Sequence, residues 1–220
     1  MSQDQVFAVT DVASVPLVPE LRLRLLMPTH PLWHATPEEA EAQGLRMPYW
    51  AFAWPGGQVL ARWVLDHPDL VAGRRVLDIG SGGAIEGLAA ARAGARAVHC
   101  WDIDPLAAAA ARVNAELNGV QAVEAIVDDP LDHAPHALTG EVVLVGDLTF
   151  DEAIVTRLVP WLRAHVELGR TVLVGDAGRV GLPPDFIAVG RHAAPFDGNP
   201  NGSTDWFGTI RRLGPPPEHV

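Results

Sequence analysis

The sequence predicts an α/β protein built on a doubly wound, mostly parallel sheet of seven strands that ends in an antiparallel C-terminal hairpin. From Gly73 onward, short apolar runs rich in valine alternate with helical segments rich in alanine. Strands that are apolar throughout are typical of parallel sheets with helices on both faces. Only a turn-rich segment separates the last two strands, which predicts a hairpin at one edge of the sheet.

The individual elements follow from the spacing of apolar residues. The predicted strands cover residues 74–79, 95–102, 123–127, 141–147, 170–176, 186–192 and 205–213, and the helices between them cover residues 85–93, 105–117 and 151–166. Before Gly73 the pattern is irregular. It predicts a strand over residues 21–26, a helix that begins at Thr36 and Pro37, a turn at residues 55–57 and a helix over residues 59–65.

Composition and charge exclude several classes of protein. No run of roughly 20 apolar residues could span a membrane, and the acidic N-terminal residues are unlike a secretion signal or a transit peptide. We therefore expect a cytoplasmic monomer without membrane contact. Sixteen basic and 27 acidic residues give a net charge of −11, which argues against nucleic acid as a partner. The single cysteine, Cys100, and the spacing of the histidines predict no disulfide and no metal.

A glycine loop follows the first strand of the regular region. The segment Gly80–Gly83 comes directly after the apolar run that ends at Ile79. Glycine suits this position because the turn needs unusual backbone angles, and because a side chain would keep a ligand away from the backbone. The second strand ends at Asp102, where a carboxylate can accept hydrogen bonds from both ribose hydroxyls of an adenosine. This pattern predicts a Rossmann-like nucleoside site.

Three residues favour S-adenosylmethionine over a nicotinamide dinucleotide as the ligand. The dinucleotide fingerprint G-x-G-x-x-G requires glycine where this chain has Ile85. Glu86, in the first turn of the helix, would repel a pyrophosphate. Asp78 adds negative charge beside the loop, which suits the sulfonium and ammonium groups of S-adenosylmethionine. The alternative is a generic Rossmann-like turn that binds another nucleotide or none.

Longer segments resemble one family closely. They are PYWAFAWPGGQVLARWVLDHPDLVAGRRVLDIGSG, WDIDPLAAAAARVNAELNG, VVLVGDLTFDE and VLVGDAGR. They are similar to the lysine methyltransferases that modify the electron transfer flavoprotein beta subunit, which are class I, seven-strand methyltransferases. Ribosomal protein L11 methyltransferases are more distant, because their Asn-Pro-Pro-Tyr-type segment after the fourth strand is absent here.

The resemblance implies a cofactor, S-adenosyl-L-methionine, and residues that bind it. Trp54 would lie over the cofactor, Asp78, Gly80 and Gly82 would hold its methionine end, Asp102 would take the ribose, and Asp128 (or Asp129) would meet the adenine amino group. Residues 1–55 would be an N-terminal extension packed on the cofactor and substrate face. Residues 56–214 would form the methyltransferase domain.

The resemblance also implies a substrate and catalytic residues. The substrate would be lysine side chains of the electron transfer flavoprotein beta subunit. Asp147 begins a D-x-x-Y/F-like segment that ends at Phe150 and faces the substrate. We expect Asp147 to accept a hydrogen bond from the incoming ammonium; alternatively, it caps the helix near Asp151. Arg179, in GDAGR, either orders neighbouring carboxylates or lies in a simple turn.

Two departures from the family pattern leave the function open. The loop reads GSGGA followed by Ile85 and Glu86, and Phe150 stands where tyrosine is common. Lysine methylation of the flavoprotein subunit is the first interpretation. The others are methylation of a ribosomal protein or a small amine, and a catalytically degenerate binding module.

Overall fold

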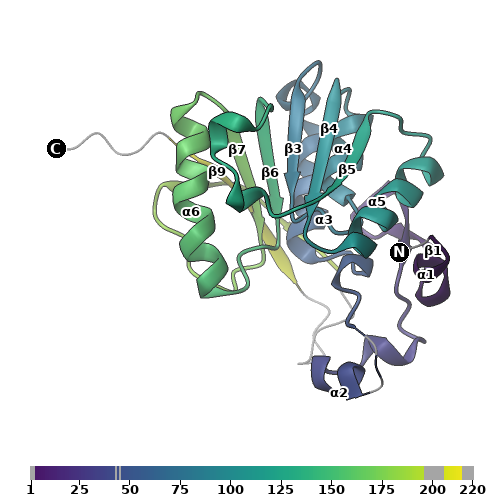
Figure 1. Ribbon diagram of the computed structural model, residues 1–220. Coiled ribbons are helices and arrows are strands. Elements are labelled where there is room, and N and C mark those ends of the chain that lie inside the picture. The colour runs from purple at the N-terminus through teal and green to yellow at the C-terminus, as the bar shows by residue number, and fades with distance from the viewer. Residues whose placement is uncertain (1–2, 43, 45, 196–205, 215–220) are drawn as a thin grey trace.

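The computed structural model describes residues 3–42, 44, 46–195 and 206–214 (Figure 1). Its centre is a seven-stranded sheet in the order β5-β4-β3-β6-β7-β9-β8. The strands are β3 Arg75–Ile79, β4 Ala97–Asp102, β5 Val123–Val127, β6 Val142–Gly146, β7 Thr171–Asp176, β8 Phe186–Ala193 and β9 Phe207–Leu213. All seven predicted strands are confirmed. The strand order reverses between β3 and β6, which is where sheets of this kind bind ligands.

The last two strands pair antiparallel, as predicted, and the structure adds their order in the sheet. β9 lies between β7 and β8 and is antiparallel to both, so β8 forms the edge. The turn-rich segment DGNPNGST, predicted to join these strands, lies outside the described residues. Because β9 runs against β7, the start of β9 lies beside the carboxyl end of β7.

Helices cover both faces of the sheet, and each face has its own core. The helices are α3 Pro55–Asp66, α4 Ile85–Arg92, α5 Pro105–Leu117 and α6 Glu152–Glu167. Side chains of a strand point alternately to opposite faces. Val76 therefore joins the core formed with α3, α4 and α5, while its neighbour Leu77 joins the core formed with α6.

Helix α3 begins earlier than the sequence predicts. The turn predicted at Pro55, Gly56 and Gly57 is wrong, because these residues form the first turn of α3. Proline is favourable at the first helical position. The glycines let this turn approach the sheet closely: a Cβ added to Gly56 would lie 2.5 Å from the carbonyl oxygen of Gly175. Close packing thus offsets the low helix propensity of glycine.

A second, antiparallel pair of strands precedes α3. It consists of β1 Asp11–Val15 and β2 Val18–Leu25, which confirms the predicted strand near residues 21–26. Two asparagines of α5 bind the backbone of β2. Asn114 Oδ1 accepts a hydrogen bond from Arg24 N at 2.8 Å, and Asn118 Oδ1 accepts one from Arg22 N at 3.1 Å. These bonds fix the N-terminal strands to a helix of the main domain.

Two short helices complete the N-terminal region. α1 Gln3–Val9 packs on α5, and α2 Pro37–Ala42 begins where the sequence predicts. Thr36 Oγ1 accepts a hydrogen bond from Glu39 N at 3.2 Å, and Glu39 Oε2 accepts one from Thr36 N at 2.8 Å. This reciprocal pair is a capping box. Among the described residues, no helix combines the length and the apolar character needed to cross a bilayer.

Candidate active site

The glycine loop lies where the carboxyl ends of β3, β4 and β6 meet. Gly80 and Gly82 have φ angles of 65° and 49°, which confirms that this turn needs left-handed backbone. Ser81 N donates to the Trp101 carbonyl at 3.0 Å and ties the loop to β4. A Cβ added to Gly80 would lie 2.6 Å from the Leu148 side chain. Because its left-handed backbone disfavours any other residue, glycine suits this position whatever the ligand.

Asp102, at the end of β4, holds the glycine loop. Its Oδ2 accepts a hydrogen bond from Gly82 N at 2.8 Å, and its Oδ1 accepts one from Asp104 N at 2.9 Å. Burial raises the pKa of Asp102 in spite of these bonds. Each carboxylate oxygen can accept a second hydrogen bond. Asp102 therefore keeps acceptor capacity for two hydroxyl groups while it orders the loop.

Asp78 lies beneath the loop. Its side chain is fully buried, and its Oδ2 accepts a hydrogen bond from Gly87 N, in α4, at 2.9 Å. The thiol of Cys100, a buried residue of β4, lies 3.7 Å from the same oxygen. Burial raises the pKa of Asp78 to about 7. The structure thus gives Asp78 a role in fixing α4, and its contact with the methionine end of a ligand stays a prediction.

Glu86 lies in the first turn of α4, as the sequence predicts, but its side chain is buried. Its side chain is 4% exposed and packs against Gly57 and Gly146, under the first turn of α3. Burial, together with the charges of Asp78 and Asp147, raises the pKa of Glu86 well above its usual range. A buried carboxyl whose neutral form is favoured does not repel a pyrophosphate at the loop. The sequence argument from Glu86 against a dinucleotide is therefore wrong.

Asp147 follows β6 and lies under the N-terminus of α3. Its φ angle is 53°, which is uncommon for a residue other than glycine. Its side chain is 8% exposed, and Oδ2 accepts a hydrogen bond from Gly57 N at 3.1 Å. The first amides of a helix lack partners within it, so Asp147 caps α3. The predicted alternative, a cap near Asp151, is wrong because Asp151 caps α6 with its own side chain.

The electrostatic state of Asp147 reflects two opposing influences. Burial raises its pKa to about 6, while the Arg179 guanidinium and the amides of Gly57 and Gly56 act in the opposite direction. Arg179 Nη1 lies 3.9 Å from Asp147 Oδ1. The GDAGR segment therefore brings its arginine to the carboxylate of the D-x-x-F segment, as one of the two interpretations of Arg179 predicts.

Trp54 immediately precedes α3 and borders the same place. Its Nε1 donates to the Tyr49 carbonyl at 2.8 Å, and its ring centroid lies 5.1 Å from that of Phe52. The guanidinium carbon of Arg179 lies 5.1 Å from the Trp54 ring centroid. Trp54 thus presents a ring face to a cation beside Asp147.

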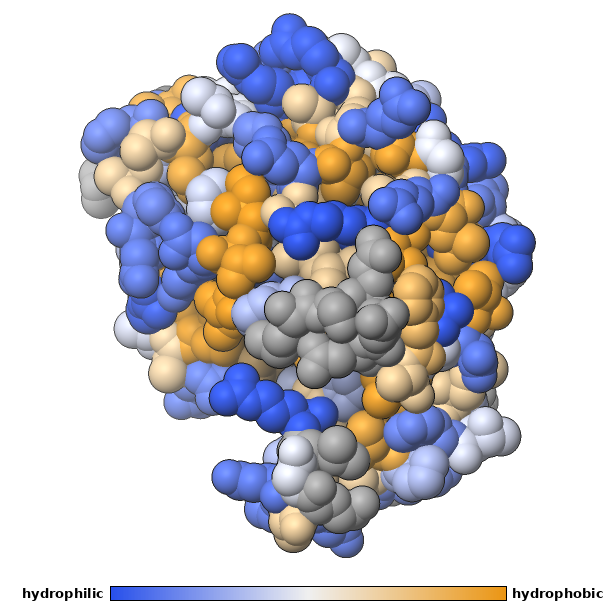
Figure 2. All heavy atoms as spheres, turned by 45° about the vertical axis from the view of Figure 1, so that its right-hand side comes forward, coloured by the Kyte–Doolittle hydropathy of each residue, from blue (hydrophilic) through white to orange (hydrophobic). Residues whose placement is uncertain are grey.

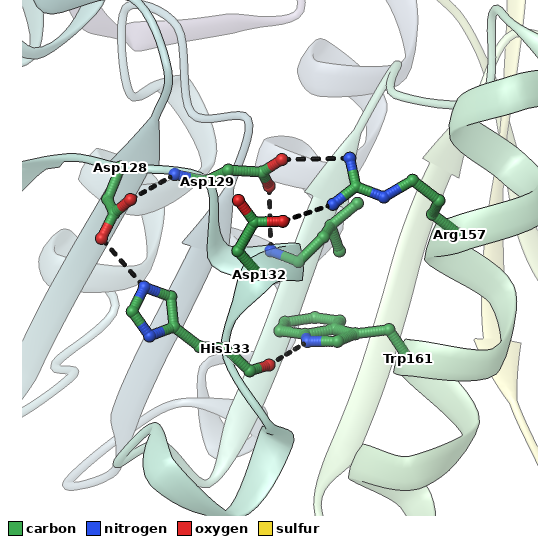
Figure 3. A network of polar contacts seen from close by, with 7 residues as sticks. Asp128, Asp129, Asp132, His133, Arg157 and Trp161 are labelled. Carbon is green, nitrogen blue, oxygen red and sulfur yellow. Dashed lines mark hydrogen bonds and ion pairs between the residues drawn. The ribbon is translucent and has the colours of Figure 1, made fainter.

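The loop after β5 holds a polar network (Figure 3). Asp128 Oδ2 lies 2.9 Å from His133 Nε2, a contact that lowers the pKa of Asp128. Asp128 N also donates to the Asp102 carbonyl at 3.1 Å. Asp129 instead pairs with Arg157, on α6, at 3.1 Å. Of the two aspartates predicted near the adenine, Asp128 thus lies next to Asp102, whereas Asp129 is engaged toward α6.

The segment after Asp147 anchors one side chain and exposes another. Thr149 Oγ1 donates to Asp176 Oδ1 at 2.9 Å, and Asp176 Oδ2 also pairs with Arg211 at 3.2 Å. Phe150 is 51% exposed. On the side that Figure 2 presents, apolar and polar side chains both lie at the surface. The structure places Asp147 inside the site and Phe150 on the surface nearby.

Two residues of the site were not selected by sequence reasoning. Asn114 Nδ2 donates to the Gly83 carbonyl at 2.9 Å, so Asn114 links the glycine loop to β2. A polar residue inside an alanine-rich helix was a signal for it, because buried amides are hydrogen-bonded. The Trp206 ring centroid lies 5.6 Å from the guanidinium carbon of Arg179. Its position depends on the strand order, which no local pattern reveals.

The arrangement suits an adenosine that carries a positive charge. Asp102 offers acceptors to a ribose, and the carboxylate of Asp147 and the face of Trp54 favour a cation. Within the part of the chain that the structure describes, no group of three or more His, Cys, Asp or Glu residues could hold a metal ion.

Comparison with known proteins identifies the class to which the chain belongs. The model of the family "Ribosomal protein L11 methyltransferase (PrmA)" matches residues 62–172. The fold is similar to that of a solved putative methyltransferase complexed with SAH, with a TM-score of 0.59, 13% sequence identity, and coverage of 94% of this chain and 56% of that one. Fold, site and family match together define a class I S-adenosylmethionine-dependent methyltransferase.

Curated relatives narrow the class. The electron transfer flavoprotein beta subunit lysine methyltransferase of Xenopus laevis is 41% identical over 194 residues, which are 85% of this chain and 74% of that protein. The protein of the same name from Danio rerio is 40% identical over 169 residues, 76% of this chain and 64% of its own length. The chain belongs to the electron transfer flavoprotein beta subunit lysine methyltransferase family.

Proposed function

We propose that this chain transfers methyl groups from S-adenosylmethionine to lysine side chains of the electron transfer flavoprotein beta subunit. The observation that carries the proposal is Asp147, a buried carboxylate at the carboxyl end of β6 with a left-handed backbone. A strained, buried acid at the carboxyl end of a parallel strand is typical of functional sites in sheets of this kind. The names of the relatives supply the substrate.

The cofactor site of the proposal uses the residues that the sequence analysis selected. Asp102 would take the ribose hydroxyls, Gly80 and Gly82 with the buried Asp78 would hold the methionine end, Trp54 would lie over the cofactor, and Asp128 would take the adenine amino group. The fit rests on the spare acceptor capacity of Asp102 and on its bond to Gly82 N. Residues 1–55 are proposed to cover this face, because Asn114 joins β2 to the glycine loop.

The substrate side of the proposal requires alignment and a neutral amine. When bound, the cofactor supplies a methyl group already activated on a sulfonium. A lysine amine has a pKa of about 10.4 and is mostly protonated at pH 7. Asp147 would accept a hydrogen bond from the arriving ammonium and orient it, and the ammonium would lose its proton to water, so that a neutral amine is held in place for methyl transfer. Phe150 lies at the surface where the protein substrate docks.

The test is methyl transfer from labelled S-adenosylmethionine to the purified flavoprotein subunit. The parent chain should label the subunit, and Asp147→Asn should lower the rate by roughly a hundredfold or more, as for other electrostatic groups at reaction centres. Binding of S-adenosylhomocysteine should be nearly unchanged. Asp66→Asn, at the opposite end of α3, is the matched control and should retain full activity. Equal rates for the Asp147 and Asp66 variants would contradict the assigned role.

A second candidate substrate is ribosomal protein L11, because the L11 methyltransferase family model matches residues 62–172. Both proteins should be offered to the enzyme in the same assay. Labelling of L11 with an unlabelled flavoprotein subunit would favour the second candidate. The cytoplasmic location and the monomeric state remain predictions from the sequence.

A further inference from the structure

Arg179 lies in a cage formed by three separate parts of the chain. Its guanidinium carbon lies 5.1 Å from the ring centroid of Trp54, which precedes α3, and 5.6 Å from that of Trp206, which precedes β9. Its Nη1 lies 3.9 Å from Oδ1 of Asp147, which follows β6. Two indole faces and a carboxylate are the groups that proteins use to bind organic cations.

Two of the three cage walls, Trp54 and Asp147, are more firmly held than the cation inside. Trp54 is fixed by its hydrogen bond to the Tyr49 carbonyl at 2.8 Å, and Asp147 by its bond from Gly57 N at 3.1 Å. The contact between Arg179 and Asp147, at 3.9 Å, is longer than a hydrogen bond. The Arg179 side chain is 28% exposed. The guanidinium is attracted by the ring faces and by the carboxylate charge, but it makes no short directional hydrogen bond to Asp147. It can therefore leave the cage at a small cost in free energy.

We infer that Arg179 is a resident cation in the lysine site: its guanidinium occupies the Trp54–Trp206–Asp147 cage until the substrate ammonium displaces it. This inference rests on the proposed function, because it takes Asp147 as the carboxylate that meets the ammonium. Two cations in contact with one carboxylate repel each other, so the guanidinium and the ammonium occupy the cage in turn. In the resting protein, the nearby positive charge of Arg179 favours the ionised form of Asp147.

The inference predicts that the cage gains affinity for a free cation when Arg179 is removed. The probe is n-butylammonium, which has the charge and the chain of a lysine side chain, and n-butanol is its uncharged counterpart. Binding is followed through the indole signals of ¹⁵N-labelled tryptophan, with the signal of Trp54 identified from Trp54→Phe. In Arg179→Ala, the dissociation constant of n-butylammonium should be about tenfold lower than in the parent, and that of n-butanol unchanged.

The matched control is Arg191→Ala. Arg191 also lies over an aromatic ring, 4.5 Å from the Phe207 centroid, but it is exposed on the edge strand β8. The Arg191→Ala variant should bind n-butylammonium with the same dissociation constant as the parent. Arg179→Gln provides a second variant, and a cooperative thermal unfolding transition like that of the parent verifies that each variant is folded.

The inference is overturned if neither variant of Arg179 binds n-butylammonium more tightly than the parent. It is also overturned if removal of Arg179 chiefly weakens S-adenosylhomocysteine binding, which would make Arg179 a cofactor ligand. The proposed function fails by a different result, namely no transfer to the flavoprotein subunit by the parent chain. If the Arg179 variants bind n-butylammonium more tightly but the parent chain transfers no methyl group to the flavoprotein subunit, the cation site stands. Only the named substrate is then refuted.

Discussion

Substitution of Asp147 by asparagine should stabilise the protein although it slows methyl transfer. The Asp147 carboxylate is 8% exposed, and burial raises its pKa from 3.8 to about 6. Asparagine has nearly the same shape without the charge, it can still accept a hydrogen bond from Gly57 N, and it tolerates the left-handed backbone at this position.

The size of the gain follows from the pKa. A rise from 3.8 to about 6 is roughly two pKa units, and each unit corresponds to about 1.4 kcal/mol, so the charged form is disfavoured by roughly 3 kcal/mol in the folded protein. The net attraction of Arg179 is already included in this value. At pH 8, Asp147→Asn should therefore raise the free energy of unfolding by up to about 3 kcal/mol.

The gain must depend on pH with a definite sign. Because the folded protein binds the Asp147 proton more tightly than the unfolded chain does, the parent loses stability as the pH rises from about 4 through about 6. The variant has no such proton. The difference in stability between variant and parent should therefore be small near pH 4, grow up to about pH 6 and stay constant above it.

Urea unfolding of both proteins at several pH values between 4 and 8 measures this difference. Asp66→Asn, which removes an exposed carboxylate paired with Arg62, should change stability by less than about 1 kcal/mol at each pH. A variant of Asp147 that is less stable than the parent at pH 8, or a difference that does not vary with pH, would refute the reasoning.

Two further substitutions test how the site is held. Gly56→Ala should destabilise the protein by about 1–3 kcal/mol in thermal unfolding, because its Cβ would lie 2.5 Å from a backbone carbonyl oxygen. Gly181→Ala, with open space around it, should not destabilise the protein. Equal effects of the two substitutions would contradict the close approach of α3. Asn114→Ala should lower stability by about 1–3 kcal/mol and weaken S-adenosylhomocysteine binding, because it removes the bonds to Gly83 O and Arg24 N. Unchanged affinity for S-adenosylhomocysteine in that variant would show that the link to β2 does not order the loop.

Much of the fold could be predicted because it follows from local patterns. The alternation of apolar strands with alanine-rich helices depends on backbone geometry and on which faces are buried. The exceptions are informative. The prediction of a turn at Pro55–Gly57 failed because the close packing of Gly56 against the end of β7, and of Gly57 against α4 and the end of β6, outweighs their low helix propensity.

The candidate site could be predicted less completely. Asp102 and the glycine loop were recognisable because a turn after one strand and an acid after the next meet at the same sheet edge. The direction of a side chain is not a local property. Glu86 turns inward because Gly57 and Gly146 leave room for its carboxyl group, and no pattern around position 86 contains that information.

By itself the sequence determined the succession of strands and helices along the chain, the glycine turn, and the acidic residues beside that turn. These features depend on periodicity and on the conformational range of single residues. Tertiary structure alone decided that Asp147 caps α3 and that Arg179 lies between Trp54 and Trp206. Those contacts join segments far apart in the chain. They exist because β9 inserts between β7 and β8 and because two glycines bring α3 onto the strand ends.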